Sequence, residues 1–438
     1  MNYKAFEQKK QFIIGKNVVG IDPAKSKHQL ALVNPDGISL HGSFTVSADH
    51  NGFTETLWKK LKKRLDNINK ENIVFAIETS CNLWNVFAHY LHSNGWTVLL
   101  VSPLTTYQAR PKMNHDYSKT DPKDALIIAN ETRAGHFDFY RQYSPEINAM
   151  HDLSISYDKL RKDVCQYKGR IRGIIERVFP EYLTVLNLDT KTSRYLLKQY
   201  FLPYHYSQMD IIKEAKAVRK LSNGNHKIKT LQRLKEKAKM SIGISQTEIE
   251  ETMLKSQLTC WLTLLEGALE QQNIILTNLL EITEQTPYFN ILKSIKGISD
   301  ITAALFIAET RDLAMFKHPK QIEKMAGFNL RQSQSGNIYG SRRISRIGNK
   351  RLRWVLYRMA EETKNHIPEV RKKYLIRQLK RKCYRKNVVA AIPVLLRLIM
   401  NLIKENREYE FRESSQKELE KLEKQYEAKK TGKKRQAA

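Results

Sequence analysis

Short apolar runs alternate with amphipathic stretches over the first 135 residues of the chain. The apolar runs are bounded by turn-forming residues, as in NVVGIDPA and NIVFAIET, and such runs are typical of β-strands. Apolar positions three and four residues apart indicate helices in the intervening stretches. Strands are predicted at 17–24, 28–37, 40–47, 72–79 and 96–103, and helices at 51–65, 83–95 and about 120–135. This order is that of a ribonuclease-H-like (Holliday-junction-resolvase-like) α/β domain with a mixed sheet.

Strand signals end at about residue 148, and the remaining sequence has helical periodicity. The stretch 245–283 is too long for an ordinary globular helix. Paired with the long basic amphipathic helix at 151–180, it predicts an antiparallel coiled coil. Four parts are therefore expected. They are an α/β domain at 1–147, a helical and coiled-coil linker and oligomerisation region at 148–290, a helical domain at 291–405 and a basic, frayed tail at 406–438.

Composition favours a folded protein of a reducing compartment. The chain has 438 residues, 41% of them hydrophobic, which is enough for two or three domains with their own cores. Its four cysteines are scattered without a C-x-x-C pair, which argues against a disulfide framework and a zinc site. No apolar run approaches the roughly 20 residues of a membrane span, and the first residues have no signal-peptide core. We expect a soluble cytoplasmic protein without a membrane partner.

The net charge of the chain is the strongest indication of its partner. Lys and Arg number 75 against 45 Asp and Glu, a net charge of +30. Residues 341–438 carry 29 basic and 11 acidic side chains, whereas residues 1–150 carry 18 and 14. Such an excess favours a polyanionic partner, and nucleic acid is the usual one. A basic membrane-surface helix is the alternative, but the charge is not confined to one amphipathic segment.

Four carboxylates of the N-terminal domain form the candidate chemistry. Asp22 ends the first predicted strand and Glu78 ends the fourth, and these two strands are neighbours in a ribonuclease-H-like sheet. Asp121 and Asp124 lie three residues apart, so they share one face of the following helix. An acid at the end of a buried strand is costly unless it is paired or binds metal. Mg²⁺ or Mn²⁺ bound by these acids would suit phosphodiester chemistry.

Helix capping is the plainer reading of KTDPKDALIIA, residues 119–129. Asp121 could cap the helix with Pro122 at its first position, and Asp124 would then lie in the first turn, where acids suit the helix dipole. Capping accounts for Asp121 and Asp124 alone. It does not account for the two strand-end acids, so the four together favour a metal site.

The C-terminal domain contains a second group of candidate residues. Residues 292–309 read as a helix–hairpin–helix, whose turn at Gly297 could hold a DNA phosphate through backbone N–H groups; a plain helical hairpin reads the same. A Ser-Gly-rich loop with Ser333, Ser335 and Ser341 follows, and then a helix rich in basic residues. The basic residues suited to nucleic-acid backbone contacts are Arg342, Arg343, Arg346, Lys350, Arg351 and Arg353.

Taken in order, GIDPAKSK, FAIET, KTDPKDA, KGISDITAALFIAE, MAGFNL, SQSG and ISRIGNKRLRWVLY resemble the DEDD transposases of the insertion-sequence one-ten family. These are RNA-bridged recombinases related to the Piv invertase, and the resemblance covers nearly the whole chain. It implies that Asp22, Glu78, Asp121 and Asp124 hold a divalent metal. It also implies that the serine of the Ser-Gly loop, best matched by Ser335 with Ser333 as second choice, is the nucleophile that forms a covalent DNA-phosphoserine.

The resemblance further implies several partners. A non-coding guide (bridge) RNA from the element itself would pair with donor and target DNA, while the protein reads RNA shape and backbone. The site would be shared within a dimer or tetramer of a prokaryotic, nucleoid-associated protein. Two other functions stay open on the residues themselves. One is a metal-only, structure-selective nuclease without use for Ser335, and the other is a non-catalytic nucleic-acid-binding protein.

Overall fold

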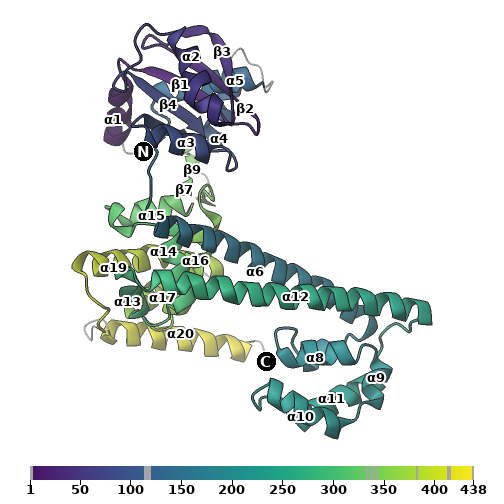
Figure 1. Cartoon of the computed structure of the whole chain (residues 1–438). Coiled ribbons are helices and arrows are strands. Elements are labelled where there is room, and N and C mark those ends of the chain that lie inside the picture. The colour runs from purple at the N-terminus through teal and green to yellow at the C-terminus, as the bar shows by residue number, and fades with distance from the viewer. Residues whose placement is uncertain are drawn as a thin grey trace. The chain divides into compact units, whose positions relative to one another are not determined.

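The chain forms two compact units, residues 1–143 and 144–438 (Figure 1). The computed structural model describes residues 3–112, 120–331, 334–335, 338–339, 343–380, 383–411 and 416–436. The first unit is a mixed α/β domain, and the second is mostly helical. The broad prediction of an α/β domain followed by an all-α region is therefore confirmed.

A six-stranded sheet in the order β3-β2-β1-β4-β5-β6 organises the first unit. β1 pairs antiparallel with β2 and parallel with β4, and β4 pairs parallel with β5, so the first and fourth strands are neighbours as predicted. The short edge strand β6, antiparallel to β5, was not predicted. The strands are β1 (Asn17–Asp22), β2 (Lys27–Val33), β3 (Ser39–Ser47), β4 (Ile73–Glu78), β5 (Thr97–Val101) and β6 (Asp138–Phe139).

Helices cover both faces of this sheet. One face, which includes Ile21 and Ile77, packs on Leu57 of α2 and Leu91 of α3. The opposite face, which includes Val74, packs on α5. The helical elements of the unit are α1 (Tyr3–Ile13), η1 (Gly52–Thr56), α2 (Leu57–Lys62), α3 (Trp84–Ser93), α4 (Pro103–Ala109), η2 (Arg110–Lys112) and α5 (Asp121–Arg133). Of these, α1 and α4 were not predicted.

Helix α5 lies unusually close to β1, and Gly20 makes this possible. A Cβ atom at Gly20 would lie 2.2 Å from the carbonyl oxygen of Ala125 and 2.7 Å from the backbone nitrogen of Ala129. The helix therefore presents small residues, four apart, to a strand position without a side chain. Because Asp121 and Asp124 belong to the first turn of α5, this contact sets their height above the ends of β1 and β4.

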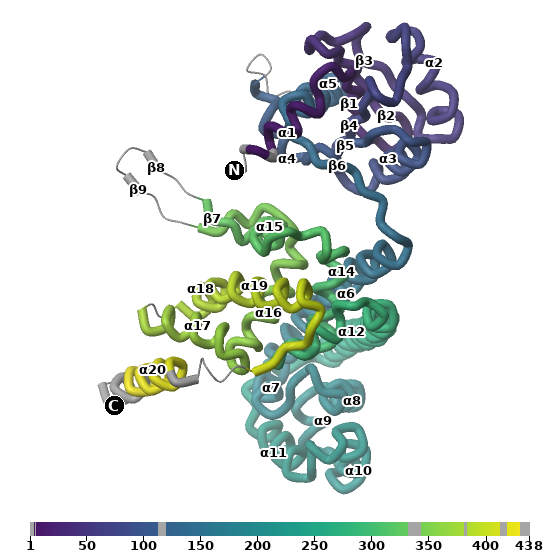
Figure 2. The backbone as a smooth tube through the Cα atoms, turned by 90° about the vertical axis from the view of Figure 1, so that its left-hand side faces the viewer, coloured from purple at the N-terminus to yellow at the C-terminus, as the bar shows by residue number. Residues whose placement is uncertain are grey.

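Two long antiparallel helices, α6 (Pro145–Val178) and α12 (Glu248–Thr283), run side by side in the second unit (Figure 1). Between them the chain forms five short helices, four of which are grouped in Figure 2 as α8 to α11. These helices share a core with the C-terminal half of α6 and the N-terminal half of α12, which we call the far half of the long pair. The core includes Tyr182, Tyr206, Leu231 and Leu258. They are α7 (Tyr182–Val185), α8 (Lys191–Gln199), α9 (Pro203–Gln208), α10 (Ile211–Leu221) and α11 (Ile228–Lys239).

A second core in this unit joins the C-terminal helices. Phe306, Leu356 and Leu396 are fully buried in it. The segment Tyr384–Glu405 is apolar and long enough to cross a membrane by length and composition, but its helix α19 supplies much of this core. The helices are α13 (Pro287–Lys293), α14 (Asp300–Thr310), η3 (Leu313–Met315), α15 (Pro319–Met325), α16 (Lys350–Thr363), α17 (Pro368–Lys380), α18 (Tyr384–Val389) and α19 (Ile392–Glu405).

Two expectations for the C-terminal half are corrected. The tail was expected to be frayed, but residues Gln416–Gln436 form helix α20, which lies against α17. Arg371 pairs with Glu423 at 3.2 Å and Lys372 with Glu418 at 2.5 Å, while Leu419 and Leu422 contact the core. Strand signals were expected to end near 148, but four two-residue strands occur: β7 (Leu330–Arg331), β8 (Gln334–Ser335), β9 (Ile338–Tyr339) and β10 (Arg343–Ile344).

Replacement of Gly20 by Ala should loosen the α5–β1 contact. The new methyl group must displace backbone rather than a flexible side chain, and overpacking of this kind costs about 1–3 kcal/mol. Native-state hydrogen exchange should show faster exchange of the β1 and α5 amides. Gly173→Ala in α6 is the matched control, because nothing lies within 4 Å of its Cβ position. That helix-interior change should stabilise the chain by up to about 1 kcal/mol. Unchanged exchange in Gly20→Ala would show that α5 does not depend on the close contact.

Candidate active site

Asp22 and Glu78 are the last residues of two neighbouring parallel strands. Ile21 of β1 pairs with Ile77 of β4, so the two acids are the next residues along each strand. Side chains alternate between the faces of a strand, which turns both acids toward the face covered by α5. Glu78 is 8% exposed and Asp22 is partly exposed. The predicted meeting of the two acids at one edge of the sheet is confirmed by this pairing.

Helix α5 brings the other two predicted acids to the same end of the sheet. The helix begins at Asp121, and its N-cap is Thr120, whose side chain accepts no capping hydrogen bond. Asp121 is thus a first-turn residue and not the cap that the capping interpretation assumed. Asp121 is exposed, whereas Asp124 is 2% exposed and faces the interior.

Arg110 is the positive charge of this site, and sequence reasoning missed it. Its Nε and Nη2 each donate a hydrogen bond of 2.8 Å to one carboxylate oxygen of Asp124. These hydrogen bonds raise the pKa of Arg110, and the negative charges of Asp124, Glu78 and Asp22 raise it further. Arg110 therefore contacts Asp124 directly and lies near enough to Glu78 and Asp22 to interact with their charges.

The donor set suits a hard divalent cation. Carboxylate oxygens are the ligands that Mg²⁺ and Mn²⁺ accept, and Asp121 is open to solvent, so a cation and a phosphate could reach it. The described residues contain no group of three or more ligating side chains already drawn together around one point. Among the four acids, Asp124 has a counter-charge of its own in the bidentate pair with Arg110.

The predicted serine loop lies in the second unit. β7 pairs antiparallel with β10 and β8 pairs antiparallel with β9. We call these four paired strands the serine hairpin. Ser335 is the last residue of β8. Ser333, Ser341 and Arg342 lie outside the described residues.

Two of the predicted nucleic-acid-binding arginines also make contacts within the protein. Nη1 of Arg353 donates hydrogen bonds to the carbonyl oxygens of Ala326 at 2.8 Å and Arg346 at 3.2 Å. Nε of Arg351 lies 2.5 Å from Oε1 of Glu309. The side chains of Arg343, Arg346 and Lys350 are exposed and remain available to a partner.

Glu309 is a fully buried carboxylate that the sequence did not single out. Besides Arg351, it accepts hydrogen bonds from Ser154 of α6 at 2.7 Å and from the side-chain amide of Asn349 at 2.5 Å. Asn349 also caps α16 by accepting hydrogen bonds from the backbone of Arg351 and Leu352. Glu309 thus ties α6, α14 and the start of α16 together just after the serine hairpin.

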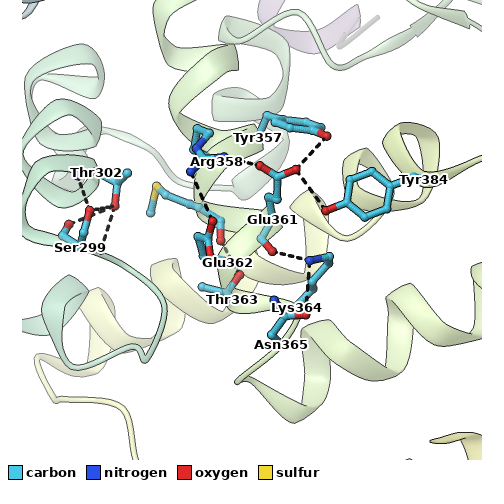
Figure 3. Close-up of polar contacts among 11 residues, drawn as sticks. Ser299, Thr302, Tyr357, Arg358, Glu361, Glu362, Thr363, Lys364, Asn365 and Tyr384 are labelled. Atoms are coloured by element: carbon cyan, nitrogen blue, oxygen red, sulfur yellow. Dashed lines mark hydrogen bonds and ion pairs between the residues drawn. The ribbon is translucent and has the colours of Figure 1, made fainter. Parts of the chain in front are cut away.

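The turn at Gly297 is a close packing point in the structure. With φ at +101°, a Cβ there would lie 3.0 Å from the backbone of Glu362 and Thr363. Ser299 and Thr302 form a capping box at the start of the next helix (Figure 3). At the end of α16, Tyr357, Arg358 and Tyr384 all contact Glu361 (Figure 3), and burial together with Glu361 raises the pKa of Tyr384 to about 12.

Comparison with protein families decides the assignment. Residues 19–180 match the family model of the DEDD transposases of IS110, described as "Transposase", and residues 289–375 match the model described as "Transposase IS116/IS110/IS902 family". The two segments together span more than half of the chain and contain both predicted groups of site residues. The chain belongs to the IS110 family of DEDD transposases.

Two curated relatives of this transposase come from insertion elements. The "uncharacterized 44.8 kDa protein" of insertion element IS116 from Streptomyces clavuligerus is 23% identical over 350 residues, 78% of this chain and 83% of the relative. The "uncharacterized 43.6 kDa protein" of insertion element IS110 from Streptomyces coelicolor is 24% identical over 264 residues, 59% of this chain and 64% of the relative. The chain is therefore an insertion-sequence transposase, an enzyme that acts on DNA, and its family implies dependence on a divalent metal.

The Arg110–Asp124 pair predicts a measurable coupling in stability. Arg110→Gln leaves a buried carboxylate without a counter-charge, which costs about 3–5 kcal/mol. The double variant Arg110→Gln, Asp124→Asn should cost clearly less than the single change, because both charges are then absent. Urea unfolding without divalent metal would measure both costs, with Arg133→Gln at the far end of α5 as the control. Additive losses would mean that the two side chains are not coupled.

Proposed function

We propose that this transposase performs RNA-guided DNA cleavage and strand exchange through a covalent serine–DNA intermediate at a divalent-metal site. The observation that carries the proposal is the convergence of Asp22, Glu78 and Asp124 around Arg110 at the ends of β1 and β4. Membership of the DEDD family supports the same four acids, with Asp121 exposed beside them. The ribonuclease-H-like class of the domain is part of this proposal, and the strand order supports it.

The acids would hold Mg²⁺ or Mn²⁺, with Asp121 as the most accessible ligand. Such an ion would stabilise the negative charge that develops on the scissile phosphate. Arg110 balances the charge of Asp124, and its two hydrogen bonds hold that carboxylate in one orientation. The chain therefore keeps the first turn of α5 in place before substrate arrives.

Ser335 is proposed as the nucleophile, on the strength of the family pattern. Its hydroxyl oxygen would attack phosphorus, the bond to the 3′ oxygen would break, and that oxygen would take up a proton to give a free 3′-hydroxyl. The phosphoserine ester keeps the energy of the phosphodiester bond, because attack by a second 3′-hydroxyl restores a DNA linkage and frees the serine. A water nucleophile would discard that energy.

The proposed guide is a non-coding RNA from the element itself, which pairs with donor and target DNA. The net charge of +30 and the exposed side chains of Arg343, Arg346 and Lys350 support contacts to nucleic-acid backbone. Assembly as a dimer or tetramer, with the acids and the serine shared between subunits, belongs to the same proposal. The length of the packed α6–α12 pair supports its use as the oligomerisation element.

Asp121 gives the sharpest test of the metal site, because an exposed side chain can be changed at little cost to the fold. Asp121→Asn should abolish metal-dependent DNA cleavage while the melting temperature stays within about 1–2 °C, since exposed substitutions seldom exceed about 0.5 kcal/mol. Asp36→Asn, an exposed acid in the turn between β2 and β3, should cleave normally. Full cleavage by Asp121→Asn would remove Asp121 from the metal site.

Ser335→Ala distinguishes the recombinase from a metal-only nuclease. It should block cleavage while titration with Mn²⁺ still shows metal binding, because the acids are unchanged. Wild-type protein trapped on nicked DNA should carry a protein-linked band on a denaturing gel, and peptide mapping should place the adduct at Ser335. Cleavage that survives in both Ser335→Ala and Ser333→Ala would support the nuclease instead.

A further inference from the structure

The short helices between α6 and α12 form a strongly basic surface that the catalytic proposal does not use. Residues 209–240, which contain α10 and α11, hold ten Lys and Arg against three acids. They lie between the two segments that match the family models, which end at 180 and resume at 289. Neither model therefore assigns a role to this helical pair.

The three acids of the pair do little to neutralise its outer surface. Asp210 caps α10 by accepting hydrogen bonds from the backbone of Ile212 and Lys213. Glu214 is buried and accepts hydrogen bonds from Tyr195 at 3.0 Å and Tyr200 at 2.9 Å. Asp210 and Glu236 are exposed, and of these two Asp210 is engaged as the helix cap. The acids thus mainly support the fold, while the basic side chains point outward.

Helical spacing sorts the basic residues into rows. α11 buries Leu231, Leu234 and Ala238, and the opposite side of the helix carries Lys229, Arg233 and Lys237 at intervals of four. Residues four apart are about 6 Å apart along a helix axis, so the row forms a line of regularly spaced charge. Lys216 and Lys220 form a similar exposed row on α10. Four of these side chains form no ion pair within the described part of the chain: Lys216, Lys220, Lys229 and Arg233.

The kind of partner follows from what the surface lacks. Residues 209–240 contain no Phe, Tyr or Trp, and proteins that hold single strands stack bases on such rings. Rows of Lys and Arg without aromatic residues suit phosphates that a duplex holds at fixed spacing. We propose that the α10–α11 pair is a docking surface for the phosphate backbone of double-stranded DNA. This proposal depends on the transposase assignment and on no part of the metal or serine chemistry, because a transposase must bind DNA on both sides of the cleavage point.

The surface is mechanically suited to hold DNA apart from the site of chemistry. It shares its core with the far half of the α6–α12 pair, through residues such as Leu234 and Leu258. The C-terminal core, next to the serine hairpin, includes Met150 and Leu279 from the opposite end of the same pair. A phosphate contact on α11 is therefore fixed by a packed core and not by a loose loop.

The test compares two triple variants of the full chain with equal loss of charge. Lys216→Gln, Lys229→Gln and Arg233→Gln remove charge from the α10–α11 pair. Lys59→Gln, Lys62→Gln and Lys63→Gln remove the same charge from exposed positions in α2 and at its C-cap. Binding to a mixed-sequence DNA duplex is measured over a range of salt concentrations, with circular dichroism as a check on folding.

The α10–α11 variant should bind DNA about tenfold or more weakly, and the slope of log K against log salt should fall by about 2–3, since each lost phosphate contact removes about 0.9. The α2 variant should change less in both measures. Lysine acetylation followed by mass spectrometry should show Lys216 and Lys229 protected by the DNA duplex in the wild-type protein. Equal losses in the two variants, or unprotected lysines, would overturn the proposal and leave a solvated basic face.

Two further probes identify the partner. An RNA duplex and a single-stranded DNA of the same sequence are titrated against both variants. Preferential loss of RNA-duplex binding would reassign the surface to RNA and overturn the DNA proposal, and so would a loss confined to single strands. None of these measurements requires cleavage. A failure of the serine or metal chemistry would therefore leave their outcome unchanged, and the two proposals can fail separately.

Discussion

A carboxylate buried at the end of a sheet must have a positive partner, and this constraint organises the first unit. Asp124 is almost fully buried, and a lone charge there would be far too costly. Arg110 satisfies it with two hydrogen bonds and also experiences the charges of Asp22 and Glu78. Arg110, which follows α4, is therefore joined to α5 by a carboxylate of the candidate metal site.

Fold prediction succeeded where burial dictates the side-chain pattern. β1 and β4 are buried along nearly their whole length, so their sequences are short continuous apolar runs bounded by turn-forming residues. β6 has two exposed residues and leaves no such pattern. α20 was missed for the opposite reason. Its composition is that of a solvated tail, and only Leu419, Leu422 and Tyr426 mark the side that packs on the core.

The sequence pointed to the acids of the candidate site and did not point to Arg110, the positively charged side chain beside them. Asp22 and Glu78 stand out because a charge directly after a buried apolar run is costly, and the parallel pairing of β1 and β4 then brings them together. Arg110 precedes α5 by a stretch without periodicity, and nothing local marks it as the partner of Asp124. Glu309 was hidden in a similar way, because it directly follows the apolar run of α14 and the partners described above are at least 40 residues away in either direction.

Glu309 also has a consequence for the order in which the protein is made. Its carboxylate needs Ser154, which is synthesised well before it, and Asn349 and Arg351, which are synthesised after it. The complete set of hydrogen bonds to Glu309 can form only after residue 351 has left the ribosome. Burial of this carboxylate with all its native partners is therefore a late step in the synthesis of the chain.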